Sequence, residues 1–184
     1  LSVALEEGIT SDPGFMLPKI NYHLHTETAD EIISFFPGLK KEDLPNEEGW
    51  AMETLKISSH NGTHMDAPYH YHSTMSNGKR AITIDEVPLE WCFNNAIKLD
   101  FRSYKDGYVI KVDDVKKELD RIEHKISPLE IVFVNTSAGG RYGEDDFLLK
   151  GCGIGREATI YLLDQGVRLT GTDAWSWDAP FKYT

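Results

Sequence analysis

Residues 59–72 restrict what this chain can fold into more than any other stretch. They hold four of the seven histidines in 184 residues, interleaved with a carboxylate, a glycine and a proline. Gly62, Thr63 and Pro68 are poor residues for a helix interior. The stretch is therefore expected to form an extended or bent segment rather than a helix.

Within this stretch, His60, His64 and Asp66 occupy even positions, and an extended backbone turns such side chains to one side. In a straight strand, at about 3.3 Å per residue, His60 and His64 would lie roughly 13 Å apart, which is awkward for one ion. Gly62 can bend or bulge the chain so that the two rings converge. Two imidazoles and one carboxylate leave a divalent ion with open positions, as in catalytic sites, and suit Zn²⁺, Mn²⁺ or Fe²⁺.

Two other interpretations of the stretch stay open. The i, i+4 spacing of His60 and His64 also occurs on metalloprotease helices, but Asn61 stands where that motif has its glutamate base. Alternatively, the histidines form a solvated loop without a ligand, as some histidine-rich tracts do. The interleaved glycine, aspartate and proline weigh against this second alternative.

Periodicity in the rest of the chain predicts a mixed α/β domain. The apolar run at 130–135 is typical of a strand covered on both faces, and the alternation at 20–24 is typical of a half-buried strand. No repeat or linker divides residues 1–184, which indicates a single domain. Strands are expected at residues 1–5, 20–24, 50–58, 96–100, 130–135 and 167–171, and helices at 29–36, 113–124 (with Asp113 as N-cap) and 156–165.

Composition and charge exclude several classes of function. A net charge of −11 argues against a surface that binds nucleic-acid phosphates. No apolar run approaches the roughly 18 residues of a membrane span. Cys92 and Cys152 stand sixty residues apart, which fits neither a metal pair nor a disulfide framework. We therefore expect a cytoplasmic protein without nucleic-acid or membrane partners.

The histidine stretch also resembles a known family signature. It matches every fixed position of His-x-Gly-Thr-His-x-Asp-x-Pro-x-His, the signature of the cyclase family of metal-dependent hydrolases, which includes kynurenine formamidase (arylformamidase) and isatin hydrolase. The matching residues are His60, Gly62, Thr63, His64, Asp66, Pro68 and His70. Residues 36–39, 48–51 and 171–178 resemble further stretches of the isatin-hydrolase-like members.

The resemblance implies a site and an activity. His60, His64 and Asp66 would bind one or two divalent ions, manganese or zinc, and His70 would transfer protons. The expected reaction is hydrolysis of a C–N bond in an amide or cyclic amide by a metal-activated water. The alternative is a relative of the same fold that binds a metal or a small molecule without turnover.

The resemblance also implies a fold and an assembly. The family fold is a swivelling β/β/α domain with a mixed, barrel-like sheet, usually in a homodimer or higher homo-oligomer. Other members take a further His and Glu from a later segment. We therefore expect residues 1–184 to be a single cyclase-like domain that lacks its C-terminal segment.

Aromatic side chains suggest an aromatic amide or lactam substrate. Phe36 and Trp50 are the candidate substrate-binding residues, although core packing explains such residues equally well. Arg141 is either a contact for an anionic substrate or a solvated loop residue. The glycines at 151–155 are spaced G-x-G-x-G rather than G-x-G-x-x-G, which argues against a dinucleotide site.

Overall fold

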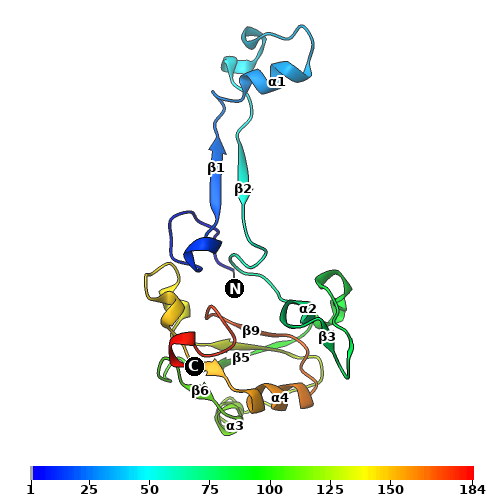
Figure 1. The fold of residues 1–184 in the computed structure, drawn as a ribbon, viewed down its shortest axis with the longest axis vertical. Helices are drawn as coiled ribbons and strands as arrows, with labels where there is room; N and C mark the ends of the chain where they lie inside the picture. Colours follow the sequence, from blue (N-terminus) through cyan, green and yellow to red (C-terminus); the bar gives the residue numbers. More distant parts are fainter. Residues whose placement is uncertain (1) are drawn as a thin grey trace. The chain divides into compact units, whose positions relative to one another are not determined.

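The computed structural model describes residues 2–184, which form two compact units (Figure 1). The first unit contains Gly14–Thr63 together with residues 2–8, and the second contains His64–Thr184 together with Ile9–Pro13. Residues 2–5 form no strand, so the strand predicted there is wrong, and Leu1 lies outside the described residues. None of the described helices is long and apolar enough to cross a membrane.

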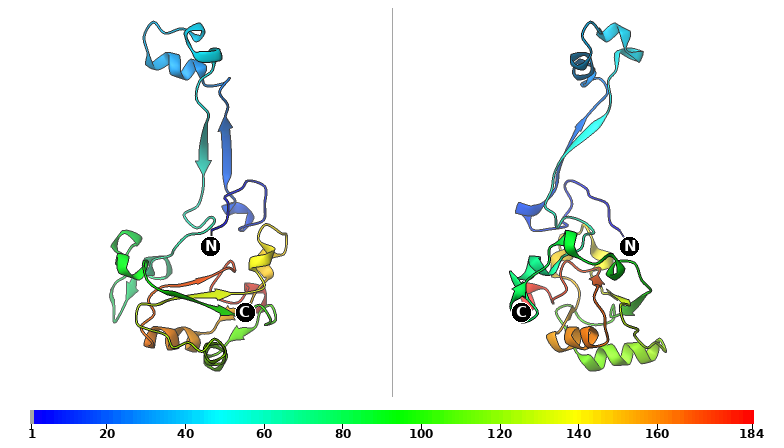
Figure 2. Two further views of the ribbon diagram at one scale, coloured as in Figure 1. Left: turned by 180° about the vertical axis from the view of Figure 1, so that it is seen from behind. Right: turned by 90° about the vertical axis from the view of Figure 1, so that its right-hand side faces the viewer.

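The first unit is built on an antiparallel hairpin of strands β1 (Lys19–His23) and β2 (Met52–Lys56). Lys19 pairs with Lys56 at one end of the hairpin, here called its base, and His23 pairs with Met52 at the other end, its tip. The helix α1 (Ala29–Phe35) follows the tip. Figure 2 shows α1 and the short helices of this unit; the 3₁₀ helices are η1 (Gly14–Met16), η2 (Lys41–Asp43) and η3 (Pro45–Glu47).

The hairpin is more exposed than its alternating pattern predicts. Ile20 is buried, with 9% of its surface exposed, but Tyr22 on the same face is 64% exposed. Every residue of β2 is exposed, and Leu55, opposite Ile20, is 53% exposed. The strand at residues 20–24 is therefore present, but the prediction that it is half-buried is wrong, because only two strands pair and no other described element covers its apolar face.

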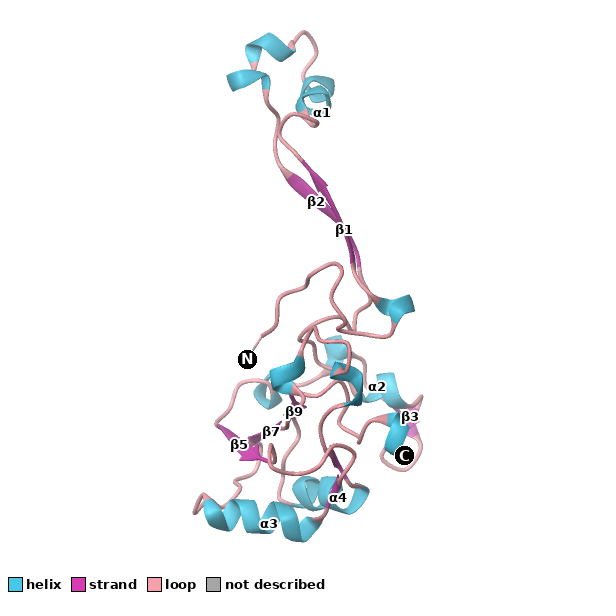
Figure 3. Cartoon of the chain, turned by 90° about the vertical axis from the view of Figure 1, so that its left-hand side faces the viewer, coloured by secondary structure: helices cyan, strands magenta, loops and turns pink. Residues whose placement is uncertain are grey.

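The second unit contains a parallel three-stranded sheet in the order β5 (Ala96–Asp100), β7 (Ile131–Asn135), β9 (Thr170–Thr172). The helices α3 (Val112–Arg121) and α4 (Arg156–Asp164) lie on one side of these strands (Figure 3). The smaller elements are α2 (Pro68–Tyr71), the antiparallel pair β3 (Thr74–Met75) and β4 (Lys79–Arg80), the parallel pair β6 (Val109–Ile110) and β8 (Gly153–Ile154), and the 3₁₀ helices η4 (Ile84–Glu86), η5 (Leu89–Trp91), η6 (Gly139–Arg141), η7 (Phe147–Leu149) and η8 (Phe181–Tyr183).

The core of the second unit lies between this sheet and its two helices. Its fully buried side chains come from each layer and include Leu99 of β5, Val132 of β7, Val115 of α3 and Leu162 of α4. Burying side chains of this size contributes about 1.5–3 kcal/mol each. Every residue of β7 is buried or half-buried, which confirms the prediction of a strand covered on both faces.

Several predicted boundaries need correction. The helix expected to run to His124 ends at Arg121, since Glu123 has a left-handed φ of 52° that a helix cannot contain. Asp113 is not its N-cap: Lys111 holds that position, and its backbone N donates to Asp114 Oδ2 at 2.9 Å. The strand expected at 167–171 lies instead at Thr170–Thr172.

Other predictions match the structure. The strand at 96–100 is β5, and the helix at 156–165 is α4, which ends just before Gly166 with its left-handed φ of 93°. The mixed α/β class is confirmed. The described strands form one three-stranded and three two-stranded sheets, so the barrel-like arrangement stays a prediction, as does the single domain.

Candidate metal centre

A buried asparagine holds the backbone that precedes the histidines. After β2 the chain turns, and the Asn61 backbone N donates to Ser58 O at 3.1 Å. The Asn61 side chain is buried: its Oδ1 accepts from Ser58 N at 2.7 Å, and its Nδ2 donates to Met16 O at 2.9 Å. A buried amide with both ends bonded is costly to displace, so it fixes the position of His60.

Gly62 bends the chain between the two histidines predicted as ligands. Its φ of 65° is left-handed, a conformation that glycine adopts without a steric penalty. A Cβ at this position would lie 2.8 Å from Leu5 Cδ2. The bend that the sequence predicts at Gly62 is therefore confirmed, and its left-handed φ favours glycine there; an added Cβ would also make the end of the Leu5 side chain shift.

The bend brings the three predicted ligands together. One donor atom from each of His60, His64 and Asp66 lies within 4.8 Å of the other two. His64 Nε2 lies 3.6 Å from Asp66 Oδ1. Ligands of one ion at about 2.1 Å are separated by roughly 3–4 Å, so small side-chain movements would complete a coordination shell. A set of two nitrogens and one carboxylate fits a divalent metal.

The three ligand candidates remain accessible. His60 and Asp66 are half-buried and His64 is exposed. A structural metal site is normally closed by four protein ligands, whereas a catalytic site leaves a position for water or substrate. The arrangement is therefore compatible with an ion that an external molecule can reach.

A tyrosine that sequence reasoning missed contacts the carboxylate of this group. Tyr71 donates its hydroxyl hydrogen bond to Asp66 Oδ2 at 3.3 Å. The pKa of Tyr71 is raised above its usual value, first by desolvation and then by the Asp66 charge. The five-residue spacing spans the change from extended backbone at Ala67 to helix α2, so no regular periodicity indicates this contact.

The predicted proton-transfer residue lies on the same short helix. His70 is exposed, and its ring meets the Tyr71 ring edge-on, with centroids 4.9 Å apart. The end of the histidine stretch is helical, so the prediction of an extended or bent segment is wrong for residues 68–71: Pro68 occupies the first turn of α2, where its fixed φ favours the start of a helix. His72 follows this helix, and its Nδ1 accepts from Thr74 N at 3.0 Å. The catalytic role of His70 stays a prediction.

The two predicted substrate residues lie at the other end of the hairpin from His60. Trp50 precedes the tip end of β2, whereas His60 follows its base end, and the strand alone spans roughly 13 Å. Trp50 Nε1 donates to Glu31 Oε2 at 3.4 Å, and Phe36 is exposed. The chain does not bring Phe36 or Trp50 to its own His60, and their substrate role stays a prediction.

Other residues singled out from the sequence have structural partners. Arg141 donates from Nε and Nη2 to Asp146 Oδ1 at 2.9 and 2.6 Å, so its positive charge is paired with a carboxylate of the same chain. A Cβ on Gly153 would lie 1.8 Å from Ala179 N, so close packing explains a glycine of the 151–155 run. His124 lies beyond helix α3 and pairs with Glu130 at 3.0 Å.

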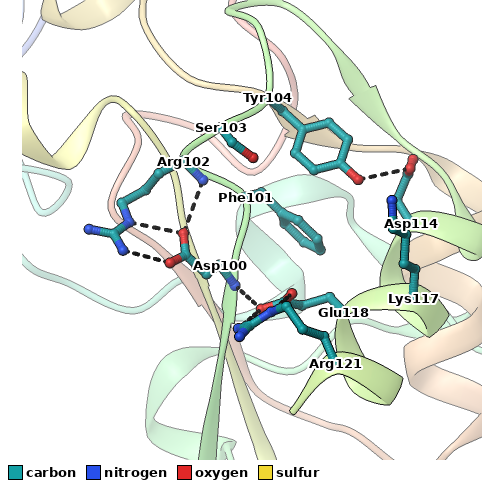
Figure 4. Close-up of a pocket in the computed structure, with 9 residues that line it drawn as sticks. All are labelled: Asp100, Phe101, Arg102, Ser103, Tyr104, Asp114, Lys117, Glu118 and Arg121. Atoms are coloured by element: carbon teal, nitrogen blue, oxygen red, sulfur yellow. Dashed lines mark hydrogen bonds and ion pairs between the residues drawn. The ribbon is translucent and has the colours of Figure 1, made fainter.

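A pocket of about 740 Å³ lies in the second unit, between the end of β5 and α3 (Figure 4). Two ion pairs line it. The Arg102 guanidinium donates two hydrogen bonds to the Asp100 carboxylate, and the Arg121 guanidinium donates two to the Glu118 carboxylate. The Glu118 carboxylate also accepts from Asp100 N at 2.8 Å. The Arg102 guanidinium lowers the pKa of Asp100 to about 2. The hydrogen bond from Asp100 N to Glu118 joins β5 to α3, whereas each ion pair lies within one segment of the chain.

Three solved structures share the fold. Isatin hydrolase A from Ralstonia solanacearum is 19% identical with a TM-score of 0.72, over 100% of this chain and 69% of that one. An isatin hydrolase bound to the product analogue thioisatinate is 19% identical with a TM-score of 0.65, over 88% and 59%. A "predicted metal-dependent hydrolase" from Bacillus stearothermophilus is 17% identical with a TM-score of 0.59, over 96% and 68%.

These structures show the fold, and the sequence shows the family. Its match spans 59% of the thioisatinate-bound isatin hydrolase, and no protein with a curated description matches it. The family model described as "Putative cyclase" matches residues 1–179. Because that match covers nearly the whole sequence and includes the histidine stretch, the chain belongs to the cyclase family.

Proposed function

We propose that this protein is a metal-dependent hydrolase that cleaves the C–N bond of an amide or cyclic amide. The observation that carries the proposal is the convergence of donor atoms from His60, His64 and Asp66. Two of the similar structures are named isatin hydrolases, and isatin is a cyclic amide. Family membership supports the same reaction class.

His60, His64 and Asp66 would hold the ion, manganese or zinc, with room for one or two ions. When bound, a divalent ion lowers the pKa of its water to about 7 and polarises a carbonyl oxygen. The protein's part is to keep the ligands converged: Asn61 and Gly62 set the backbone of His60 and His64, and Tyr71 holds one Asp66 oxygen.

His70 would move the protons of the reaction. An imidazole can accept a proton at a ring nitrogen and return it at neutral pH. In hydrolysis of an amide, the proton comes from the attacking water and goes to the leaving nitrogen. The exposed position of His70 on α2, four residues after Asp66, leaves its ring accessible to a substrate.

Aromatic side chains would bind the substrate, which we expect to be an aromatic amide or lactam, with Phe36 and Trp50 as the candidates. Exposed aromatic rings offer large apolar surfaces for a flat ligand. The family's swivelling β/β/α domain with a barrel-like sheet, and its assembly as a homodimer or higher homo-oligomer, are part of the same proposal.

The test measures metal binding and turnover separately. Wild-type protein is purified without chelator, and its metal content is compared with that of His64→Ala and of a matched control, His72→Ala. We expect His64→Ala alone to lose the metal, because His72 bonds Thr74 outside the ligand group. Unchanged metal content in His64→Ala would show that the ligand assignment is wrong.

Turnover is then assayed with isatin and N-formylkynurenine in the presence of added Mn²⁺ or Zn²⁺. We expect hydrolysis of at least one of the two compounds by wild type and His72→Ala, and a large loss with His64→Ala and His70→Ala. If the protein binds metal but hydrolyses neither these nor other aromatic amides, it is a binding relative rather than an enzyme.

A further inference from the structure

Two sulfur atoms from separate segments of the second unit meet beside the proposed metal centre. Cys92 Sγ lies 3.8 Å from Met65 Sδ, and the thiol donates its hydrogen bond to the thioether. Met65 stands between the predicted ligands His64 and Asp66, whereas Cys92 follows the 3₁₀ helix η5, twenty-seven residues later. Two soft donor atoms therefore converge from distant parts of the sequence.

The backbone of Cys92 is fixed by the turn that it closes. Its backbone N donates to Leu89 O at 2.9 Å, and the Trp91 backbone N donates to Pro88 O at 3.0 Å. Cys92 is exposed, so an ion in solution can reach its thiol. The thiol is thus both held in place and accessible.

Met65 directs its sulfur away from the His–Asp group. Residues 64–67 form no helix, and adjacent side chains of extended backbone point to opposite sides. His64 and Asp66 share one side, where their side-chain atoms lie 3.6 Å apart. Met65 is half-buried, and its sulfur contacts Cys92 instead. The sulfur pair is therefore a group distinct from the three predicted ligands, although one of its members lies between two of them in the chain.

The distance between the two sulfurs fits a shared ion. Metal ions bind thiolate sulfur at about 2.3 Å. Two sulfurs 3.8 Å apart can both lie at that distance from one ion, with an angle of about 110° between the two bonds, which is close to tetrahedral. The pair therefore already stands at the separation of two ligands of one ion.

The chemistry of the pair selects a soft ion. A thiol is a weak hydrogen-bond donor and a thioether a weak acceptor, so a cation that replaces the thiol proton between them displaces only a weak bond. Thiolate and thioether ligands together select Cu⁺, whereas imidazole and carboxylate suit harder divalent ions. The sulfur pair and the His–Asp group therefore differ in the ions that they prefer.

The other cysteine of the chain has neither property. Cys152 is 2% exposed, and its thiol donates to Phe101 O at 3.8 Å. Burial raises the pKa of this thiol to about 11, which keeps it protonated at neutral pH. A soft ion is therefore expected at Cys92 and not at Cys152.

We propose that Cys92 and Met65 form a second metal site, which takes a soft, thiophilic cation of the Cu⁺ class. On binding, the S–H bond of Cys92 breaks and its proton leaves to solvent. The thiolate and a lone pair of the Met65 thioether each form one bond to the ion, and copper stays Cu⁺ throughout. The site goes beyond the proposed hydrolase function, because it uses none of the three ligands assigned to the divalent ion.

Binding is measured by competition with bicinchoninate, a chromophoric chelator of Cu⁺, in oxygen-free buffer that contains Mn²⁺ to occupy the His–Asp group. Wild type is compared with Met65→Leu, with Cys92→Ser and with Met75→Leu. Met75 is the matched control, because it is a half-buried methionine of the same unit. We expect wild type and Met75→Leu to take up one Cu⁺ per chain and to release one proton, detected in weakly buffered solution.

The two sulfur variants give the decisive results. We expect Cys92→Ser to lose this uptake and Met65→Leu to bind Cu⁺ at least about tenfold more weakly, since loss of even an outer partner of a ligand costs 10–100-fold in affinity. X-ray absorption of the wild-type complex should show two sulfur neighbours at about 2.3 Å. Circular dichroism checks that each variant is folded.

Three results would overturn the proposal. They are a wild-type protein that takes up no Cu⁺, a Cys92→Ser protein that binds it as wild type does, and a Met65→Leu protein with wild-type affinity, which would reduce the site to a single thiol. Cu⁺ uptake is independent of turnover. A protein that binds Cu⁺ through the two sulfurs but hydrolyses no amide would therefore refute the proposed function and leave the sulfur site in place.

Discussion

The hydroxyl of Tyr71 lies 3.3 Å from Asp66 Oδ2, and this contact joins helix α2 to the proposed ligand group. The Asp66 Oδ1 atom lies 3.6 Å from His64 Nε2. One carboxylate oxygen thus faces a histidine ligand while the other is held by the tyrosine. The next residue back along α2, His70, packs its ring against the same tyrosine.

We expect Tyr71→Phe to weaken metal binding roughly tenfold without unfolding the protein, because loss of a hydrogen bond to a ligand typically costs 10–100-fold in affinity. Isothermal titration with Mn²⁺ or Zn²⁺ measures this directly. Tyr69→Phe is the control, since Tyr69 lies on the same helix and its backbone N donates to Ile82 O rather than to the ligand group. Equal affinities in the two variants would show that the Tyr71 hydroxyl does not position Asp66.

Gly62→Ala is expected to destabilise the fold by about 1–3 kcal/mol, since an alanine strains the left-handed φ and its Cβ meets Leu5. Urea unfolding measures the change in free energy, and the metal content should fall in parallel. Gly140→Ala is the control, because its backbone is not left-handed and no atom lies within 4 Å of the added Cβ. A Gly62→Ala protein with wild-type stability would contradict the proposed constraint.

The ion pair Asp100–Arg102 at the end of β5 and the ion pair Glu118–Arg121 within α3 should make the stability of the fold depend on acid pH. Hydrogen bonds from Arg121 to Glu118 lower the pKa of that carboxyl, and those from Arg102 lower the pKa of Asp100 to about 2. Both carboxyls have lower pKa values in the folded state than in the unfolded chain. Their contribution to the free energy of unfolding is therefore complete above a pH of about 5, and it is lost as the pH falls through the folded-state pKa values.

We expect Glu118→Gln to reduce the free energy of unfolding at pH 7 by about 1–3 kcal/mol and to flatten its fall between pH of about 5 and 2. Thermal or urea unfolding across this range checks both effects. Glu157→Gln is the control, because Glu157 pairs with Arg156 at 3.7 Å on an exposed surface. If the two variants gave the same pH profile, the Glu118–Arg121 pair would not be the source of the dependence.

Chelation should lower the melting temperature of wild-type protein and leave that of His64→Ala unchanged. A ligand that binds only the folded state stabilises it by about 2.7 kcal/mol at 100 times its Kd. Differential scanning fluorimetry with EDTA, followed by excess Mn²⁺ or Zn²⁺, measures the shift and its reversal. A shift of the same size in His64→Ala would place the bound ion elsewhere.

Local signals predicted much of the second unit. The strand predicted at 130–135 is β7, whose first four residues, 131–134, are all apolar, and the pattern at 96–100 forms β5 with the predicted bounds. Both strands depend on burial, which a periodic apolar pattern reports directly. The end of α3 was not predicted, because Glu123 adopts a left-handed φ and a glutamate in the sequence does not indicate such a conformation.

For the site, the sequence by itself identified the three ligand candidates and the need for a bend at Gly62, since side-chain chemistry and glycine's backbone freedom are properties of individual residues. Only the tertiary structure decided that their donor atoms converge to within 4.8 Å and that Tyr71 reaches Asp66. It also showed that Phe36 and Trp50 lie at the other end of the hairpin from His60. The length and register of the hairpin set this separation, and neither can be read from the sequence. Contacts of this kind depend on how distant backbone segments pack, and no local pattern encodes that.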